Sequence, residues 1–530
     1  MFKFILFSVL VISLETNAKT FINCSEANPT TFNPQLVNDA PTLNASSITM
    51  YNRLLRFELG TTKLVPALAE SYQVSKDGLT YTFNLRKGVK FHSTNYFKPT
   101  RDFNAEDVLF SINRQRLKDH PYYMVGGGIY PPYQGNIKDN IKSVEALNPY
   151  QVKIVLNEVQ APFIGYMAGQ FMSILSAEYA DKLIKENKKE DIDSKPIGTG
   201  PFVFQSFAKD SAVKFTAFES YWDKNSYKGN ANNKIDRLIF AITPDQGVRY
   251  QKLKTGECHF VTLPSLSDLD DMRKNPKVQV IGQEGINLGY LGMNVTKKPF
   301  DNINVRKAIH HALNRKSYLD AIYFGTGIIA KNPLPPTVWG YDESTKDYDY
   351  NLDLAKSYMK KAGLENGFET EMWTLPVARP YNPDGKKMGE LMQADLLKIG
   401  IKVNLVSLEW QTFLKKSRTG EQSLIQFGWT GNADPDTFLN DLLSCASVES
   451  GTNTARWCNK EFNDLIVKAR QTVDQKKRIE FYKKAQKVFK REVPWVTLAH
   501  SKVFRAMATN IKNFKIDPFG YDYFDQVEVQ

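Results

Sequence analysis

One arginine of the chain lies on a loop that prolines make stiff. Arg379 falls within PVARPYNP, residues 376–383, where Pro380 follows it directly and Tyr381 comes next. A guanidinium is planar, always charged and carries five donors in a fixed fork, so on a stiff loop it suits a terminal carboxylate better than lysine would. Two readings stay open for Arg379: contact with the carboxylate of a ligand, or an intramolecular salt bridge to a nearby acid.

A second stretch combines an indole with acids. In LIQFGWTGNADPDTF, residues 424–438, an apolar run typical of a buried strand ends at Trp429 and breaks into Gly, Asn and two Asp. Trp429 at the edge of a cleft would supply a flat apolar wall. Asp434 and Asp436 have the chemistry to receive an ammonium group, and equally that of turn and N-cap residues before the next helix. The pattern favours the cap for Asp436 and leaves Asp434 open between the two roles.

Strands and helices alternate around these two stretches, with short loops between them. This alternation predicts a parallel sheet covered by helices. The expected strands are residues 368–375, 401–408 and 424–429, and the expected helices are residues 385–400 and 409–420. Ligands of open parallel sheets bind beyond the carboxyl ends of the strands. The Arg379 loop and the turn after Trp429 should therefore lie on one rim, which would suit a zwitterion.

Composition excludes several classes of protein. The chain has 530 residues, more than one core usually organises, so we expect two or more lobes. The net charge of +12 comes from basic residues at helical spacing, which indicates solvated helix faces. The alternative role for these basic residues is attraction to an anionic envelope surface. No nucleic acid is expected as a partner. The sequence contains none of the common hydrolase, metalloprotease or nucleotide-binding motifs, so we predict no enzyme activity. We expect no cofactor and no metal, because the six histidines do not cluster and the adjacent His310 and His311 point to different sides of a helix, so that at most one is buried.

The first 18 residues are typical of a secretory signal peptide. Lys3 supplies a basic start, Phe4–Leu14 is apolar, and the small residue Ala18 stands at the expected cleavage point. The apolar stretch is too short to span a bilayer, and no later segment is long and apolar enough to do so. The residues before Cys24 do not form a lipoprotein box. We therefore expect an exported chain with no membrane span and no lipid anchor.

Export makes disulfides of the four cysteines the natural expectation. Four cysteines allow three pairings. Cys445 and Cys458 flank a short turn-rich segment, so local pairing is the economical choice, and it leaves Cys24 with Cys258.

Several segments together resemble one family. They include LVPALAESYQVSKDGLTYTFNLRKGVKFH, KPIGTGPF, AITPDQGVRYQKL, PVARPYNPDGKKMGELMQADL, GWTG and LLSCASVESGTNTARWCNKEFNDLI. The chain resembles family 5 of the bacterial extracellular solute-binding proteins over nearly all of its mature length. Within the family it is most similar to the dipeptide-binding branch of peptide ABC transporters.

The resemblance implies an α/β fold of the periplasmic binding protein type, class II and cluster C, in which three domains form two lobes around a ligand cleft. The implied division is a signal peptide at 1–18, domain I at 19–48, 192–283 and 503–530, domain II at 49–191, and domain III at 284–502. The family's two disulfides would be Cys24–Cys258 and Cys445–Cys458. The two lobes would hinge near Glu284 and Lys502.

The resemblance also implies a peptide site. Arg379, with Pro380 and Tyr381 beside it, matches the family's arginine for the ligand carboxylate. Other matching positions are Trp429, Thr430 and Gly431, and Asn38 from the N-terminal lobe.

The chain departs from the family where the ligand's ammonium is received. The dipeptide branch commonly has an aspartate directly after WTG, whereas here Asn432 follows Gly431 and the loop is one residue shorter. Either Asp434 takes the place of that aspartate, or the contact with the ammonium group is neutral.

We therefore expect a periplasmic binding protein, monomeric, that captures short peptides, most of all dipeptides, and delivers them to an inner-membrane ABC permease. The alternatives within the fold are a longer oligopeptide, a murein peptide, haem or a metal chelate. More remote alternatives are a secreted peptide hydrolase and a periplasmic chaperone.

Overall fold

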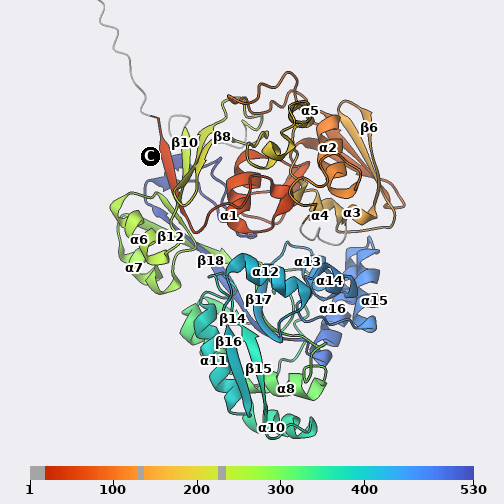
Figure 1. Ribbon diagram of the computed structural model, residues 1–530, viewed down its shortest axis with the longest axis vertical. Coiled ribbons are helices and arrows are strands. Elements are labelled where there is room, and N and C mark those ends of the chain that lie inside the picture. Colours follow the sequence, from red (N-terminus) through yellow and green to blue (C-terminus); the bar gives the residue numbers. More distant parts are fainter. Residues whose placement is uncertain (1–17, 129, 131–136, 225–233) are drawn as a thin grey trace, which may run out of the picture.

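The structure of the protein is a computed structural model, and it describes residues 18–128, 130, 137–224 and 234–530. Figure 1 shows two lobes stacked along the long axis, and we call the upper one lobe 1 and the lower one lobe 2. The predicted two-lobed α/β fold is confirmed. The predicted signal peptide lies outside the described residues except for Ala18, so it stays a prediction.

One half of a long mixed sheet forms the base of lobe 1. Strand β1 pairs in parallel with β10, from Thr20 opposite Arg237 to Ser25 opposite Ile242, and in parallel with β11 on its other side. The order across this half is β11-β1-β10-β9-β8. The bounds of its elements are β1 (Thr20–Ser25), α1 (Ala40–Leu43), β8 (Phe202–Ala208), β9 (Ala212–Ala217), β10 (Arg237–Ile242), α6 (Gln246–Thr255), β11 (Phe260–Thr262) and α7 (Leu269–Lys274).

A separate antiparallel sheet, with the order β4-β5-β7-β6, extends lobe 1 (Figure 1). Helix α2, which packs beside it, begins with a capping box: the Asn104 side chain accepts from the Glu106 N–H, and the Asp107 carboxylate accepts from the Asn104 N–H. The bounds are β2 (Leu55–Phe57), β3 (Leu64–Pro66), β4 (Ala69–Val74), β5 (Thr80–Leu85), α2 (Ala105–Arg116), α3 (Ile137–Asn140), β6 (Ile141–Asn148), β7 (Gln151–Leu156), α4 (Phe163–Tyr166) and α5 (Ala177–Lys185).

Strand β18 (Trp495–Ala508) belongs to both lobes. Its second half pairs with β12 (Val278–Glu284) and β11 in lobe 1, and its first half pairs with β13 in lobe 2. The pairing with β12 ends where Glu284 lies opposite Lys502. Just beyond, the Asn287 amide donates to the Ser501 carbonyl at 2.8 Å and accepts from the Ser501 N–H at 3.0 Å. The lobes are thus joined next to Glu284 and Lys502.

Lobe 2 contains the predicted strand and helix alternation. Strands β16, β15 and β17 are parallel neighbours, as predicted, and β13 continues the sheet antiparallel to β17. The sheet is therefore mixed and not wholly parallel. The bounds are β13 (Asn287–Met293), α8 (Ile303–Ala312), α9 (Arg315–Tyr318), β14 (Gly327–Ile329), α10 (Leu352–Lys361), β15 (Phe368–Trp373), α11 (Gly385–Leu397), β16 (Ile401–Val406), α12 (Trp410–Thr419), β17 (Leu424–Thr430), α13 (Asp436–Leu443), α14 (Cys445–Ser450), α15 (Lys460–Arg470) and α16 (Gln475–Glu492), with β19 (Ile511–Lys512) and β20 (Glu528–Val529) returning to lobe 1.

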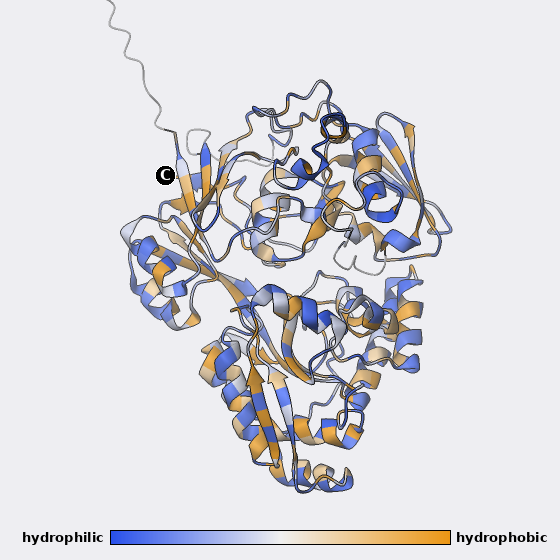
Figure 2. Cartoon of the chain, in the orientation of Figure 1, coloured by the Kyte–Doolittle hydropathy of each residue, from blue (hydrophilic) through white to orange (hydrophobic). Residues whose placement is uncertain are grey.

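Each lobe has its own core. Among the described residues, two buried clusters fill lobe 1, and the buried clusters of lobe 2 lie between its sheet and its helices. Figure 2 shows the same division, with hydrophobic residues along the strands and hydrophilic residues on the outer helices. Separate cores let the lobes move as bodies about the strands that join them.

Both predicted disulfides are present. Cys24 on β1 is bonded to Cys258, and Cys445 at the start of α14 is bonded to Cys458. The first ties the beginning of lobe 1 to the loop before β11, and the second closes a short loop in lobe 2.

Candidate ligand-binding site

A cavity with a volume of about 200 Å³ lies between the lobes. We call it the main cavity. Lobe 1 and the returning C-terminal segment line it with Glu26, Asn38, Asp39, Ala40, Arg505, Phe519 and Tyr521; lobe 2 lines it with Arg379, Tyr381, Trp410, Phe427, Trp429 and Thr430. A side cavity shares Asn38, Trp429 and Thr430 with it and continues to Gly431 and Asn432. Main-chain and side-chain groups of both lobes therefore face one space.

The predicted rim of the lobe 2 sheet forms one wall of this space. Strands β15 and β17 are parallel neighbours, so their carboxyl ends lie at the same edge. The loop after β15 carries Arg379 and Tyr381, and β17 itself ends at Trp429 and Thr430; all four residues line the main cavity. The sequence prediction that these two stretches meet is confirmed.

The Arg379 loop is a tight turn that its neighbours hold in place. The N–H groups of Arg379 and Asn382 donate to each other's carbonyls at 3.1 and 3.0 Å. The Asn382 amide then donates to Gln426 of β17 at 3.0 Å, and the Ser501 hydroxyl donates to the Pro380 carbonyl at 2.5 Å. These bonds fix the loop against both β17 and the joining strand β18.

The Arg379 guanidinium stacks on an indole. It lies over the Trp410 ring at 5.2 Å from the centroid, and its Nη1 donates to the Ala378 carbonyl at 3.1 Å. Within the described part of the chain, no carboxylate forms an ion pair with Arg379 within 4.0 Å. The salt-bridge interpretation is therefore wrong for the described residues, and the cation faces the cavity with no ion pair among them.

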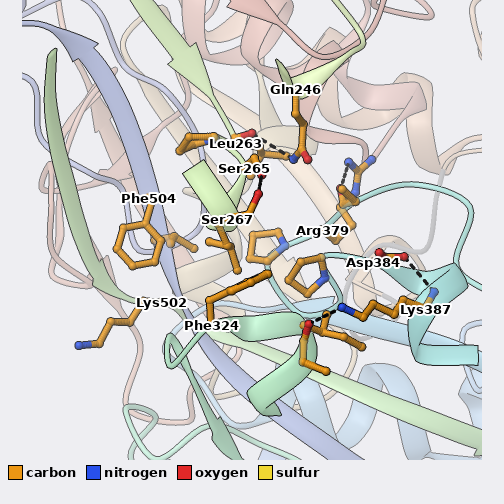
Figure 3. Close-up of a pocket in the computed structure, with 18 residues that line it drawn as sticks. Gln246, Leu263, Ser265, Ser267, Phe324, Arg379, Asp384, Lys387, Lys502 and Phe504 are labelled. Atoms are coloured by element: carbon orange, nitrogen blue, oxygen red, sulfur yellow. Dashed lines mark hydrogen bonds between the residues drawn. The ribbon is translucent and has the colours of Figure 1, made fainter. Parts of the chain in front are cut away.

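A further cavity of about 200 Å³ lies behind the Arg379 loop, toward the strands that join the lobes. Figure 3 shows Arg379 at its edge and Phe324, Lys502 and Phe504 on its walls. Arg379 therefore stands between this space and the main cavity.

Two glycines allow the close approach of backbone and rings at the cavity wall. A Cβ on Gly428 would lie 2.1 Å from the Tyr381 ring, and one on Gly431 would lie 2.4 Å from the Phe438 ring. Trp429, between them, has its Nε1–H buried without a hydrogen-bond acceptor in the described residues. The wall thus offers an apolar indole face.

The geometry does not support the prediction that Asp434 receives an ammonium group. Both Asp434 oxygens accept from Arg478, at 2.8 and 2.9 Å, and Asp434 Oδ1 also accepts from the Asp436 N–H. Burial raises the pKa of Asp434 to about 6, while the charge of Arg478 opposes the rise. Asp434 lines neither interlobe cavity, because Arg478 on α16 draws it into lobe 2.

The prediction that Asp436 caps a helix is wrong. Asp436 is the first residue of α13, whose N-cap position is Pro435, and its carboxylate is buried. It pairs with Arg470 at 3.1 Å and accepts from the Tyr166 hydroxyl at 2.8 Å. Since Tyr166 belongs to lobe 1, this bond links the two lobes. The Ala161 N–H of lobe 1 donates to the Arg470 carbonyl at 2.8 Å beside it.

Asn432 occupies the place where an acid was expected, and its oxygen is already engaged. Its Oδ1 accepts from the Asp434 N–H at 2.8 Å, and its own N–H donates to the Thr437 hydroxyl. Asn432 lines the side cavity through a neutral amide.

Sequence reasoning missed Trp410, Asp39 and Glu26. Trp410 follows the end of β16, the third parallel strand, so the strand-end rule that located Arg379 applies to it too. Asp39 and Glu26 come from lobe 1, and no local pattern in the sequence places them opposite Arg379.

The other charged groups of the main cavity differ in how far they are neutralised. Arg505 is fully paired, since its Nε donates to Asp522 at 2.5 Å. Glu26 Oε1 is buried with no hydrogen-bond donor among the described residues. Asp39 Oδ1 accepts from the Thr42 N–H at 3.1 Å, and burial raises the Asp39 pKa while the charge of Arg379 acts against the rise.

No group of three or more metal-ligating side chains gathers in the described residues, and no helix of that part of the chain is long and apolar enough to cross a bilayer. His310 and His311 are both buried, at 2% and 6% exposed, so the expectation of at most one buried histidine is wrong. His311 is covered because α10 packs on α8 and stacks Tyr358 against the imidazole ring at 5.8 Å.

Comparisons with known proteins agree with this architecture. The family model for bacterial extracellular solute-binding proteins, family 5 Middle, matches residues 63–450. The dipeptide-binding protein of Escherichia coli (strain K12) is 43% identical over 523 residues, covering 98% of this chain and 96% of that protein. Heme-binding protein A of Haemophilus influenzae is 44% identical over 512 residues, covering 96% of this chain and 92% of that protein. The crystal structure of the dipeptide-binding protein from Pseudoalteromonas sp. SM9913 in complex with Met-Leu matches with a TM-score of 0.91 and 36% identity, covering 97% of this chain and 100% of that one.

Proposed function

Because the chain belongs to the family 5 bacterial extracellular solute-binding proteins, we propose that it is a peptide-binding protein that captures dipeptides and other short peptides between its lobes. The observation that carries the proposal is the Arg379 guanidinium, which stacks on Trp410 and faces the main cavity with no carboxylate of the described residues within ion-pair distance. A free peptide brings the carboxylate that this cation lacks.

The site binds the two ends of a peptide by charge and its middle by shape. Arg379 holds the C-terminal carboxylate, and main-chain groups near Gly428 and Thr430 lie along the peptide backbone. The rings of Tyr381 and Trp429 flank the side chains. Asn38 contributes from lobe 1, and Pro380, Gly431 and Asn432 shape the floor. Walls made of rings and amides tolerate many side chains, so the peptide sequence matters less than its charged ends.

Closure of the lobes is the second part of the mechanism. A ligand favours the closed form only if it gains contacts there that the open form lacks, and a cavity lined from both lobes supplies them. The hinge lies where β12 and β18 leave their pairing, at Glu284 and Lys502. We divide the chain into a signal peptide at 1–18, domain I at 19–48, 192–283 and 503–530, domain II at 49–191, and domain III at 284–502.

The setting follows from the proposed activity. The protein works in the periplasm as a monomer, after removal of the signal peptide, and passes its peptide to an ABC permease of the inner membrane. It is a binder and not an enzyme, and it needs no cofactor.

Haem is the cargo named for one relative, and the site favours it less than peptide. Among the described residues that line the main and side cavities, none is His, Met or Cys, and tyrosine is the one common axial ligand of haem iron that occurs.

Titration calorimetry on the mature protein tests the proposal. The ligands are Met-Leu, Ala-Ala, a tripeptide and haemin. We expect saturable binding of the peptides with one site per chain, and recovery of each peptide intact by mass spectrometry. Absence of binding to every peptide, or binding of haemin alone, would overturn the assignment, and cleaved peptide would reinstate a hydrolase.

A further inference from the structure

The acids of the β17 turn cannot serve the ammonium group of a bound peptide. Asp434 is neutralised by Arg478, and Asp436 is neutralised by Arg470. Asn432 presents an amide whose oxygen already accepts a hydrogen bond. If the ligand's positive end is recognised by charge, the acid must come from elsewhere on the cavity wall.

Asp39 has the position for this role, and its carboxylate forms no ion pair within the described residues. It lies in the lobe 1 wall of the main cavity, between Asn38 and Ala40, which also line it. Its polar contacts are the N–H and the hydroxyl of Thr42, both neutral, and no cation lies within ion-pair distance of it among the described residues. Burial raises its pKa, so the carboxylate is poorly solvated and gains from a cation. The cation acting on it is Arg379, across the cavity.

We propose that Asp39 receives the terminal ammonium of the bound peptide from lobe 1 while Arg379 holds the carboxylate from lobe 2. This inference rests on the proposed function, since it assigns one end of the same ligand.

The arrangement divides the zwitterion between the lobes. Were both ends held by the β15 and β17 loops, the ligand would bind lobe 2 in the open form almost as well as in the closed form. With Asp39 on the other lobe, the ammonium contact forms only on closure, so recognition of the free amino terminus and closure become one event.

Glu26 is the competing acid, because it lines the same cavity and its Oε1 has no donor in the described residues. Its charge acts on Arg249, a cation of lobe 1, which compensates it in part. Among the described residues, no cation of lobe 1 forms an ion pair with Asp39, and the cation that acts on it is Arg379 of lobe 2. We therefore assign the ammonium to Asp39, and a Glu26 variant distinguishes this assignment from one to Glu26.

The test measures the affinity of a free dipeptide and of its N-acetylated form in the wild type, Asp39→Asn, Glu26→Gln and Asp245→Asn. Asparagine keeps the N-cap acceptor of Asp39 and removes only its charge. Asp245 is the matched control: it caps α6 by accepting from the Val248 N–H at 2.8 Å, is exposed, and lines neither interlobe cavity. We expect Asp39→Asn to bind the free dipeptide 10- to 100-fold more weakly and to lose the preference over the acetylated form, while Asp245→Asn and Glu26→Gln keep it.

Closure provides a second readout. Small-angle scattering of the wild type should show compaction with the free dipeptide and less with the acetylated one, and saturated Asp39→Asn should show the smaller change with both.

Several results would overturn the inference while the proposed function stands: equal affinity of the wild type for free and acetylated dipeptide, unchanged or tighter binding by Asp39→Asn, or loss of the preference in Glu26→Gln. If Asp39→Asn does not fold, the affinities of the wild type and of Glu26→Gln for the free and the N-acetylated dipeptide still test the inference. Failure of the wild type to bind any peptide would instead remove the proposed function itself.

Discussion

Replacing Arg379 should weaken binding in a way that depends on the ligand's carboxylate. In Arg379→Ala a bound carboxylate loses its cation in a partly buried site, and truncating one member of such a pair costs about 2–5 kcal/mol. Arg379 is half-buried and exposed to the cavity, so we take the lower part of the range, about 2–3 kcal/mol. This corresponds to a loss of affinity of roughly 30- to 150-fold.

Arg379→Lys separates charge from geometry. Lysine keeps the positive charge but lacks the planar fork and the guanidinium stacking on Trp410, so we expect a loss of about 1 kcal/mol. Arg491→Ala is the control, because Arg491 is an exposed arginine of the same lobe that pairs with Glu461. It should leave affinity unchanged.

The decisive comparison uses a dipeptide and its C-terminal amide in titration calorimetry. Amidation should cost the wild type about as much as the alanine substitution does, and should cost Arg379→Ala little, because the two changes remove the same interaction. Equal penalties for amidation in the wild type and in Arg379→Ala would show that the carboxylate does not meet Arg379, and the reasoning from the cavity would fail.

Three further changes test the surroundings of the site. Trp410→Leu removes the ring under Arg379 and should weaken binding of the free peptide by about 1 kcal/mol, as measured by calorimetry. The loss should be smaller for the amidated peptide, because the ring acts through the Arg379 guanidinium. Tyr166→Phe removes the hydroxyl that donates to Asp436 across the lobes, so the closed form should lose about 1–2 kcal/mol of stability. Small-angle scattering at subsaturating peptide should then show a larger radius of gyration than in the wild type. An unchanged radius would contradict the role of this bond. Burial raises the pKa of Asp517 to about 7, so ionisation of this carboxyl destabilises the folded state, and the destabilisation is complete above that pH. Asp517→Asn should therefore raise Tm at pH 8, with a gain in unfolding free energy of up to about 4 kcal/mol that shrinks as the pH falls from 7 towards 4. A gain independent of pH would refute the raised pKa.

The part of the site that follows one sheet could be predicted from the sequence. Arg379 and Trp429 lie at the ends of β15 and β17, and strands joined by helices must be parallel, so their ends share an edge. The rule that ligands bind at the carboxyl ends of the strands also applies to Trp410 after β16. Trp410 was missed because a tryptophan that begins a helix looks like a core residue.

The part that depends on the other lobe could not be predicted. Asp39 faces Arg379 because strands distant in sequence, β12 and β18, set one lobe over the other, and no local pattern records that placement. Asp436 was read as a helix cap from its neighbours, yet its partners Arg470 and Tyr166 lie far along the chain. Partners supplied by tertiary structure override local preference in both cases.

The joining strands explain why the charged ends of the ligand matter for closure. β18 is one continuous strand in both lobes, so we expect the lobes to rotate about the point where its partner changes from β12 to β13. That point is near Ser501, where the Asn287 side chain adds two hydrogen bonds to the backbone pairing with Gly285 and Gly327. Inverting a 1:99 balance between the closed and open forms requires about 5.5 kcal/mol of differential affinity. With the carboxylate on Arg379 and the ammonium on Asp39, each end of the peptide reaches a different lobe, and the ligand itself supplies the difference.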